Sequence, residues 1–251
     1  MASEEGNTRD DERARTGVEG FDDLCGGGLL RDHTYLAAGA AGCGKTLFAL
    51  QFLYNGATKF DEPGVFLATE ERPGRIRRNA KRFGWDFEAL ELKSKIAFLD
   101  GTSTRVGLPS TEKYVEVRGL DMDSLLDDLV RIQEEIGAVR AVVDSWSSLS
   151  YIYGDPAKAR AEALRLAATL EALGMTALVT SEWSDENRVL LESFLVDGVI
   201  LFYNSRKENF RTRSLEVYKM RGSDHSRKIH PFEITPRGIV VHAREEVYGE
   251  I

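Results

Sequence analysis

The chain carries the stretch Gly39-Ala40-Ala41-Gly42-Cys43-Gly44-Lys45-Thr46, which satisfies the pattern Gly-x-x-x-x-Gly-Lys-[Ser/Thr] at every fixed position. An apolar run at residues 34–38 precedes this stretch, and a helix-compatible run at residues 46–60 follows it. A strand, a glycine-rich loop and a helix in this order are typical of phosphate-binding loops, whereas a chance glycine loop would lack this context. The stretch therefore predicts an α/β fold and a nucleotide ligand.

Each fixed position of this loop has a chemical role. Glycines permit a tight turn whose backbone N–H groups point at phosphate oxygens, and the following helix presents the positive end of its dipole to the same anion. Lys45 adds a positive charge at the β and γ phosphates, and the Thr46 hydroxyl is placed to ligate Mg²⁺. We therefore expect ATP and Mg²⁺ as cofactors, with the nucleotide bound by Gly39, Ala40, Ala41, Gly42, Cys43, Gly44, Lys45, Thr46 and Leu47.

Strands and helices are expected to alternate on both sides of the loop. Further strands are predicted at residues 65–69, 96–99, 139–143 and 176–180, and further helices at 74–83, 121–136 and 157–173. The last part of the chain shows strands without long helices between them, at residues 199–203, 214–219, 229–234 and 239–242. Alternating strands and helices form parallel sheets covered on both faces. We predict an α/β protein with a mainly parallel central sheet flanked by helices, antiparallel strands at its C-terminal end, and an edge excursion at residues 101–119.

Composition limits the class of protein further. The 251 residues include 33 Lys and Arg against 41 Asp and Glu, which gives a net charge of −8. A chain of this length typically forms one large domain, which we place at residues 14–251 after a charged, disordered lead at residues 1–13. The acidic balance opposes broad nucleic-acid binding, and no apolar run has the length of a membrane span. Two cysteines cannot build a disulfide framework, so we expect a cytoplasmic protein.

Acidic residues follow two of the predicted strands. Asp144 ends an apolar strand, where it could hold Mg²⁺ together with Thr46 or could cap a turn. Glu70 and Glu71 follow another strand, and either carboxylate could orient and deprotonate the water that attacks the γ phosphate. The alternative is a charged pair that caps the next helix. The end of a third strand offers candidates for sensing the γ phosphate, namely Thr180, Ser181 and Glu182.

Several segments of the chain occur in the order found in one known family. They are the phosphate loop and residues 16–29, 69–73, 142–145 and 219–225, the last of which reads Lys-Met-Arg-Gly-Ser-Asp-His. With these motifs the chain resembles the KaiC-type ATPases of the RecA superfamily over about residues 14–243. It is similar to a single KaiC domain rather than to the tandem circadian-clock protein. The resemblance implies a RecA-like core.

The resemblance also implies a ring, often a hexamer, with ATP bound between subunits. The glutamate pair of that family serves hydrolysis, which implies this role for Glu70 and Glu71. Its Lys-x-Arg-Gly segment reaches the γ phosphate of the neighbouring subunit, which implies trans-acting catalytic roles for Lys219 and Arg221. A cation supplied in trans stabilises transition-state charge and makes hydrolysis depend on assembly. From the residues alone, both cations could be solvated charges. Two further residues of this segment could touch the nucleotide, Ser223 and His225.

The chain departs from the family pattern at a few positions. Ala40-Ala41 and Cys43 stand where Pro-Pro and Thr are frequent in the phosphate loop, which should leave the backbone cradle intact. A Ser-Thr pair that the clock protein phosphorylates corresponds here to Ser193-Phe194, so only one hydroxyl is present. Clock-like dual phosphorylation is therefore not expected, and autokinase activity at Ser193 is kept only as a separate hypothesis.

Two other functions stay open at this point. A RecA- or RadA-like recombination or helicase ATPase would show DNA-stimulated turnover, and a slow ATP-gated scaffold would bind a signalling or motility partner. A basic helix could contact nucleic acid or a neighbouring subunit, although a charge-rich helix is usually a solvated face. Its residues are Arg72, Arg75, Arg77, Arg78, Lys81 and Arg82.

Overall fold

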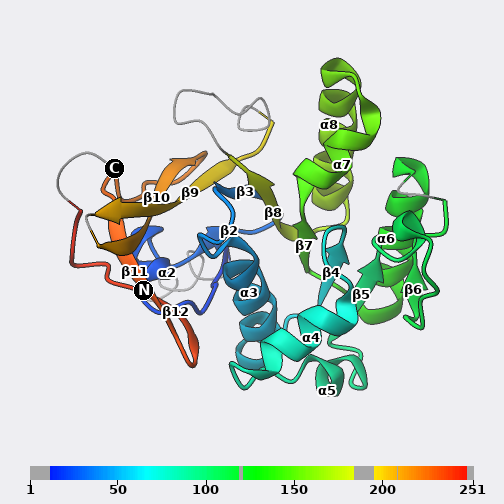
Figure 1. Ribbon diagram of the computed structural model, residues 1–251, viewed down its shortest axis with the longest axis horizontal. Helices are drawn as coiled ribbons and strands as arrows, with labels where there is room; N and C mark the ends of the chain where they lie inside the picture. Colours follow the sequence, from blue (N-terminus) through cyan, green and yellow to red (C-terminus); the bar gives the residue numbers. More distant parts are fainter. Residues whose placement is uncertain (1–11, 119–120, 184–194, 208, 248–251) are drawn as a thin grey trace, which may run out of the picture.

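A mostly parallel sheet runs through the middle of the molecule (Figure 1). The computed structural model describes residues 12–118, 121–183, 195–207 and 209–247. Within these residues the strand order is β12-β11-β10-β9-β3-β8-β7-β4-β5-β6. From β9 to β6 in this order the neighbours pair in parallel, whereas β9, β10, β11 and β12 pair antiparallel. The predicted α/β fold class, with antiparallel strands from the C-terminal part, is confirmed.

Apart from the two-residue β6, which was not predicted, the strands of this sheet coincide closely with the predicted apolar runs. The hairpin of β9 and β10 is longer than expected, because its backbone pairing continues through the mostly polar residues 204–207 and 210–213. Burial and periodicity predict the apolar part of a strand, but not how far pairing extends beyond it. The bounds are β3 (Thr34–Gly39), β4 (Gly64–Ala68), β5 (Ile96–Asp100), β6 (Tyr114–Val115), β7 (Arg140–Asp144), β8 (Thr176–Glu182), β9 (Gly198–Lys207), β10 (Phe210–Met220), β11 (His230–Thr235) and β12 (Gly238–Val241).

Helices cover both faces of the sheet, and alternate residues of each strand pack against different helices. On β4, Phe66 belongs to the apolar cluster under α3, α4 and α5, whereas Val65 and Leu67 belong to the cluster under α6, α7 and α8. This alternation follows from the two-residue period of a strand. The helices are α2 (Phe21–Leu24), α3 (Lys45–Lys59), α4 (Pro73–Lys81), α5 (Phe87–Glu91), α6 (Met122–Ile136), α7 (Trp146–Tyr153) and α8 (Pro156–Ala172).

Three short helices were not predicted, α2, α5 and α7. Each is too brief to show a sustained helical period. The last two begin with a local cap: Asp86 accepts from Ala89 N and Ser145 accepts from Ser148 N. Residues 101–118, predicted as an edge excursion, lie at the edge of the sheet that β6 forms. They also contain a 3₁₀ turn, η1 (Thr104–Val106). No helix in the described ranges combines the length and apolarity needed to cross a membrane.

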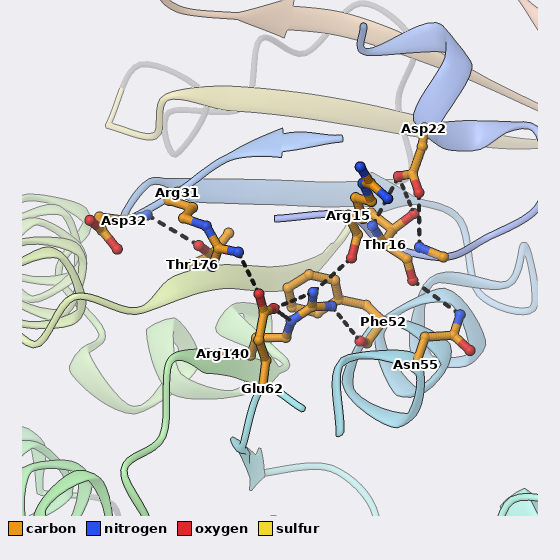
Figure 2. A network of polar contacts seen from close by, with 11 residues as sticks. Arg15, Thr16, Asp22, Arg31, Asp32, Phe52, Asn55, Glu62, Arg140 and Thr176 are labelled. Atoms are coloured by element: carbon orange, nitrogen blue, oxygen red, sulfur yellow. Dashed lines mark hydrogen bonds and ion pairs between the residues drawn. The ribbon is translucent and has the colours of Figure 1, made fainter. Parts of the chain in front are cut away.

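A buried arginine ties the N-terminal segment to the body of the fold (Figure 2). The Arg140 side chain, on β7, is 0% exposed and donates to the Glu62 carboxylate at 2.6 Å. It also donates to the carbonyl oxygens of Phe52 at 2.9 Å and Arg15 at 2.7 Å, and its guanidinium lies over the Phe52 ring. Burial lowers the Arg140 pKa and Glu62 opposes that shift. Oxygen acceptors and an aromatic face together make a buried charge tolerable here.

Further polar contacts hold the same segment against α3. The Asp22 carboxylate accepts from Thr16 N at 2.9 Å, Thr16 Oγ1 at 2.6 Å and Gly17 N at 2.9 Å, and Asn55 Nδ2 donates to Thr16 O at 3.0 Å (Figure 2). Arg13, expected in the N-terminal lead, is instead part of β1 (Arg13–Ala14), which pairs antiparallel with β2 (Leu29–Leu30). Residues 1–11 of the expected lead lie outside the described residues.

Candidate nucleotide-binding site

Most of the predicted site residues gather where parallel strands end. The phosphate loop follows β3, the glutamate pair follows β4, Asp144 ends β7, and Thr180 lies in β8. These strands are neighbours in the order β3-β8-β7-β4, so their carboxyl ends share one edge of the sheet. Ligands of open α/β sheets bind at this edge.

The phosphate loop has a shape that requires glycine. Gly44 has φ 112°, a left-handed conformation that a side chain would strain, and it immediately precedes α3. A Cβ atom on Gly39 would lie 2.3 Å from the carbonyl oxygen of Phe202 on β9. No side chain caps the N-terminus of α3, so its positive dipole end is available to an anion. These features are those of a phosphate cradle.

Lys45 lies within the loop. Its side chain is 8% exposed, and its ammonium donates to Gly39 O at 2.8 Å and Ala40 O at 3.0 Å. Cys43 is fully buried beside it, and burial raises the pKa of this thiol. The Cys43 side chain therefore packs inside the protein, with its sulfur 3.7 Å from the Lys45 ammonium nitrogen. The loop residues predicted to bind nucleotide lie together, with Lys45 as their cation.

Two threonine hydroxyls surround Asp144. Thr46 Oγ1 donates to the Asp144 carboxylate at 3.0 and 3.2 Å, and Thr180 Oγ1 donates to it from the neighbouring strand. Burial raises the pKa of Asp144, although both hydroxyls lower it and the Glu70 charge raises it further. Hard oxygen donors next to a phosphate loop match what Mg²⁺ prefers, usually one or two carboxylates plus phosphate oxygens and water. Thr46 and Asp144 therefore fit Mg²⁺, as the sequence predicts.

The two adjacent glutamates have different surroundings. The Glu70 carboxylate accepts from Ser145 Oγ and, at 3.2 Å, from Ser148 Oγ, so it lies over the start of α7 next to Asp144. The Glu71 carboxylate instead forms an ion pair with Arg75 at 2.6 Å, one turn along α4. Glu70 is thus the carboxylate whose charge acts on Asp144. The sequence did not reveal this difference, because the two serines lie at the cap and first turn of a helix that its periodicity did not predict.

The ends of β4 and β7 are joined beneath these carboxylates. Thr69 Oγ1 accepts from Ser145 N at 2.7 Å and donates to Ser145 O at 3.1 Å, and Thr69 N donates to Asp144 O at 2.9 Å. The Asp144–Ser145 peptide bond is cis. Glu70 and Asp144 are therefore held at a fixed separation by backbone and buried hydroxyl contacts.

Lys219 and Arg221 lie at the other end of the sheet. Lys219 pairs with Val199, which pairs with Leu36 on β3, and Arg221 N donates to Asp197 O at 2.8 Å beyond the start of β9. At 3.3 Å per residue, Arg221 lies about 16 Å before Gly39 along the strand direction. Burial lowers the pKa of Lys219, and Arg221 lowers it further. The chain does not bring this pair to its own phosphate loop.

Ser223 and His225 follow the same pair of cations and make contacts within the chain. Ser223 Oγ accepts from Arg13 at 2.7 Å and donates to Asp224 O at 2.9 Å, and His225 Nδ1 lies 2.9 Å from Ser226 O. Like Lys219 and Arg221, they lie away from the phosphate loop of their own chain. The Ser193 hypothesis falls outside the described residues.

Half of the predicted basic strip around α4 has carboxylate partners. Arg77 donates to both Glu91 and Glu112, with distances of 2.5 to 2.7 Å, Lys81 pairs with Glu88, and Arg75 pairs with Glu71. These pairs reduce the positive charge that phosphate binding would require. Except for Arg77, the basic residues of the strip are exposed, which agrees with the interpretation of a solvated face.

The sequence of this chain matches a model of a known protein family. A family model described as "ATPase: KaiC" matches residues 14–246. The chain belongs to the KaiC family. The resemblance predicted from the motifs is thereby confirmed.

Relatives of this KaiC-family chain differ in length. The circadian clock oscillator protein KaiC of Synechococcus elongatus is 38% identical over 231 residues, which are 90% of this chain but 43% of that protein. The chain therefore spans less than half of the clock protein. The UPF0273 protein MJ1359 of Methanocaldococcus jannaschii is 38% identical over 92% of this chain and 96% of its own length.

A solved structure resembles the KaiC-family chain over nearly its full length. The crystal structure of the KaiC-like protein PH0186 from Pyrococcus horikoshii has a TM-score of 0.80 and 40% sequence identity. The match covers 92% of this chain and 98% of that one. The predicted RecA-like fold agrees with this neighbour.

The raised pKa of Asp144 leads to a testable effect on stability. Because the folded protein holds this proton more tightly than the unfolded chain does, the free energy of unfolding should fall as pH rises from the ordinary aspartate pKa through the raised one. Asp144→Asn removes the titration, so without metal the variant should match wild type in acid and exceed its stability at pH 8. Urea denaturation across this pH range, with EDTA, measures the difference. A variant that is less stable than wild type at pH 8 would contradict the expectation.

Proposed function

We propose that this KaiC-family chain is a Mg²⁺-dependent ATPase that assembles into a hexameric ring with active sites shared between neighbouring subunits. The observation that carries the proposal is the placement of Lys219 and Arg221 at the opposite end of the sheet from Gly39. A head-to-tail contact would bring these cations to a neighbour's phosphate loop, since closed rings form through such heterologous interfaces. Within one chain they have no route to the γ phosphate.

The residues at the carboxyl edge support each step of hydrolysis. Backbone N–H groups of residues 42–46 and the Lys45 ammonium bind the phosphates, while Thr46 and Asp144 hold the metal ion. When bound, Mg²⁺ neutralises charge on the β and γ phosphate oxygens. Glu70 orients a water molecule and accepts its proton as the water oxygen bonds to the γ phosphorus and the bond to the bridging oxygen breaks. Inorganic phosphate and ADP result.

The neighbour's cations complete the site. Charge on the phosphoryl oxygens grows toward the transition state, and a guanidinium fixed by the partner stabilises it. The lowered pKa of Lys219 arises from burial and from Arg221, so an anionic phosphate near both cations would relieve their mutual repulsion. This arrangement makes turnover depend on assembly.

Arg221→Ala tests the shared site. Turnover should fall by about tenfold to a hundredfold, less than in enzymes that rely on one arginine because Lys219 remains. Particle mass with Mg·ATP should stay that of the wild-type ring. Phosphate release and light scattering on the same samples provide the measurement, with Lys45→Ala as the variant that loses nucleotide binding. Unchanged turnover in an assembled Arg221→Ala ring would exclude the trans role.

Two alternatives are separated by the same assay. A recombination or helicase ATPase requires DNA-stimulated turnover, and the internal pairing of α4 together with the net charge of −8 weighs against it. An ATP-gated scaffold for a signalling or motility partner would assemble with nucleotide yet hydrolyse slowly.

Both cysteines are free thiols, which is consistent with a reducing compartment such as the cytoplasm.

A further inference from the structure

Arg13 forms a bridge between the N-terminal segment and the segment that carries Lys219 and Arg221. Its guanidinium donates to Cys25 O at 2.6 Å and Gly28 O at 2.8 Å through one nitrogen, and to Ser223 Oγ at 2.7 Å through the other. The planar fork of arginine can satisfy acceptors on two sides at once, whereas a lysine ammonium cannot reproduce this geometry. The contact joins residues 210 positions apart in the sequence.

Other contacts hold the same segment from either side. Ser226 N donates to Leu24 O at 2.8 Å, and Arg221 N donates to Asp197 O at 2.8 Å. Between these two backbone bonds, the Arg13–Ser223 hydrogen bond links residues 222–225 to the N-terminal segment through side chains. Its loss would remove a side-chain restraint from the middle of this loop.

The backbone around Arg13 is held in place by strand pairing and by hydrogen bonds from buried side chains. β1 pairs with β2, and the Tyr35 hydroxyl accepts from Leu30 N at 2.7 Å, which fixes β2 against β3. The backbone that follows β1 is held by Arg140 and Asn55 through the carbonyl oxygens of Arg15 and Thr16 (Figure 2). Residues 13–16 therefore have the rigidity of the central sheet and α3. Such support is what holds a functional group within the narrow tolerance that catalysis requires.

We propose that Arg13 is a positioning residue, which holds the segment of Lys219 and Arg221 in the geometry that the neighbouring subunit's active site requires. This inference rests on the proposed shared site. Arg13 does not itself contact phosphate, because its guanidinium is turned to carbonyl oxygens and Ser223 of its own chain. It acts on the neighbour through the two cations at the end of β10, Lys219 within the strand and Arg221 directly after it.

A mixed-ring experiment isolates this effect. Glu70→Gln/Glu71→Gln subunits keep the phosphate loop and assemble, but hydrolyse nothing themselves, so they act on wild-type neighbours only through the residues they supply in trans. These inactive subunits are mixed in equal amounts with wild-type subunits. The inactive subunit carries no further substitution in the reference mixture, and carries Arg13→Ala, Arg221→Ala or Arg237→Ala in the others. Arg237, exposed at the turn between β11 and β12, is the matched arginine control. Phosphate release per wild-type subunit and ring mass are measured for each mixture.

The expected results differ for each partner. The Arg221→Ala partner should lower turnover per wild-type subunit to about half, since each site has one donor neighbour in a head-to-tail ring. The Arg13→Ala partner should lower it by a similar factor with an unchanged KM for ATP, whereas the Arg237→Ala partner should have no effect. If Arg221→Ala lowers turnover and Arg13→Ala does not, the positioning role is excluded. If neither lowers it, the shared site itself is excluded.

A double-mutant cycle separates positioning from general loss of structure. Ser223→Ala removes the acceptor that links Arg13 to the segment and a local bond to Asp224 O, while Arg13 keeps its bonds to Cys25 O and Gly28 O. It should lower kcat, as Arg13→Ala does. Because the Arg13–Ser223 bond is lost in both variants, their combination should be no worse than Arg13→Ala alone. Arg13→Lys, with a single ammonium, should rescue little. Additive losses in kcat, or full rescue by Arg13→Lys, would overturn the proposal.

Discussion

Glu70→Gln is expected to lower kcat for ATP hydrolysis by about 10²- to 10⁴-fold, the usual contribution of a general base. Glu71→Gln should lower it by less than about tenfold. The reason lies in the partners of the two carboxylates. Glu70 accepts from Ser145 and Ser148 beside the metal position, whereas Glu71 is held away from it by Arg75. An amide retains the shape of Glu70 but cannot accept the proton of water.

Single-turnover hydrolysis measured on both variants decides between the two glutamates. Nucleotide affinity should remain close to wild type in each, because neither carboxylate belongs to the phosphate loop. Glu71→Gln also removes the exposed ion pair with Arg75, which should change the free energy of unfolding by no more than about 1 kcal/mol. A larger loss of kcat in Glu71→Gln than in Glu70→Gln would show that the roles are reversed.

Arg140→Met is expected to reduce the free energy of unfolding by about 3 kcal/mol, the lower end of the usual range for a broken buried pair, because the Glu62 carboxylate keeps its ion pair with Arg31 at 2.5 Å. It also removes the donors to the carbonyl oxygens of Phe52 and Arg15. This is a large fraction of the roughly 5–15 kcal/mol by which most domains are stable. The N-terminal segment should detach first, since Arg140 is one of its main anchors.

Urea denaturation and amide hydrogen exchange at residues 13–17 provide the measurement for Arg140→Met. Arg131→Met serves as control, because Arg131 is exposed and its pair with Asp128 should contribute at most about 1 kcal/mol. Adding Glu62→Gln to Arg140→Met should recover little of the lost stability, because Arg31 would then lose its carboxylate partner. If Arg140→Met proves as mild as Arg131→Met, the buried network does not stabilise the fold.

The sequence was informative where local physics determines structure. The phosphate loop requires glycine at fixed spacing, and buried strands show as apolar runs, so the sheet, Lys45, Thr46 and Asp144 could all be predicted. What could not be predicted depends on contacts between distant segments. In the sequence, Arg140 is one charged residue among many, and its role follows only from the fold, which places Glu62 beside it. Arg13 belongs to a charged segment, and its role follows only from the acceptor that Ser223 supplies. The choice between Glu70 and Glu71 likewise depends on which helix each side chain meets.

The separation of the phosphate loop from Lys219 and Arg221 along one sheet also constrains symmetry. If the site is shared as we propose, each chain offers a phosphate loop at one end and two cations at the other, and a head-to-tail contact joins one kind of end to the other. In an open row of subunits, the phosphate loop of one terminal subunit would receive no cations from a neighbour. The cations of the other terminal subunit would contact no phosphate loop. Only closure of the row gives every subunit the same complete surroundings.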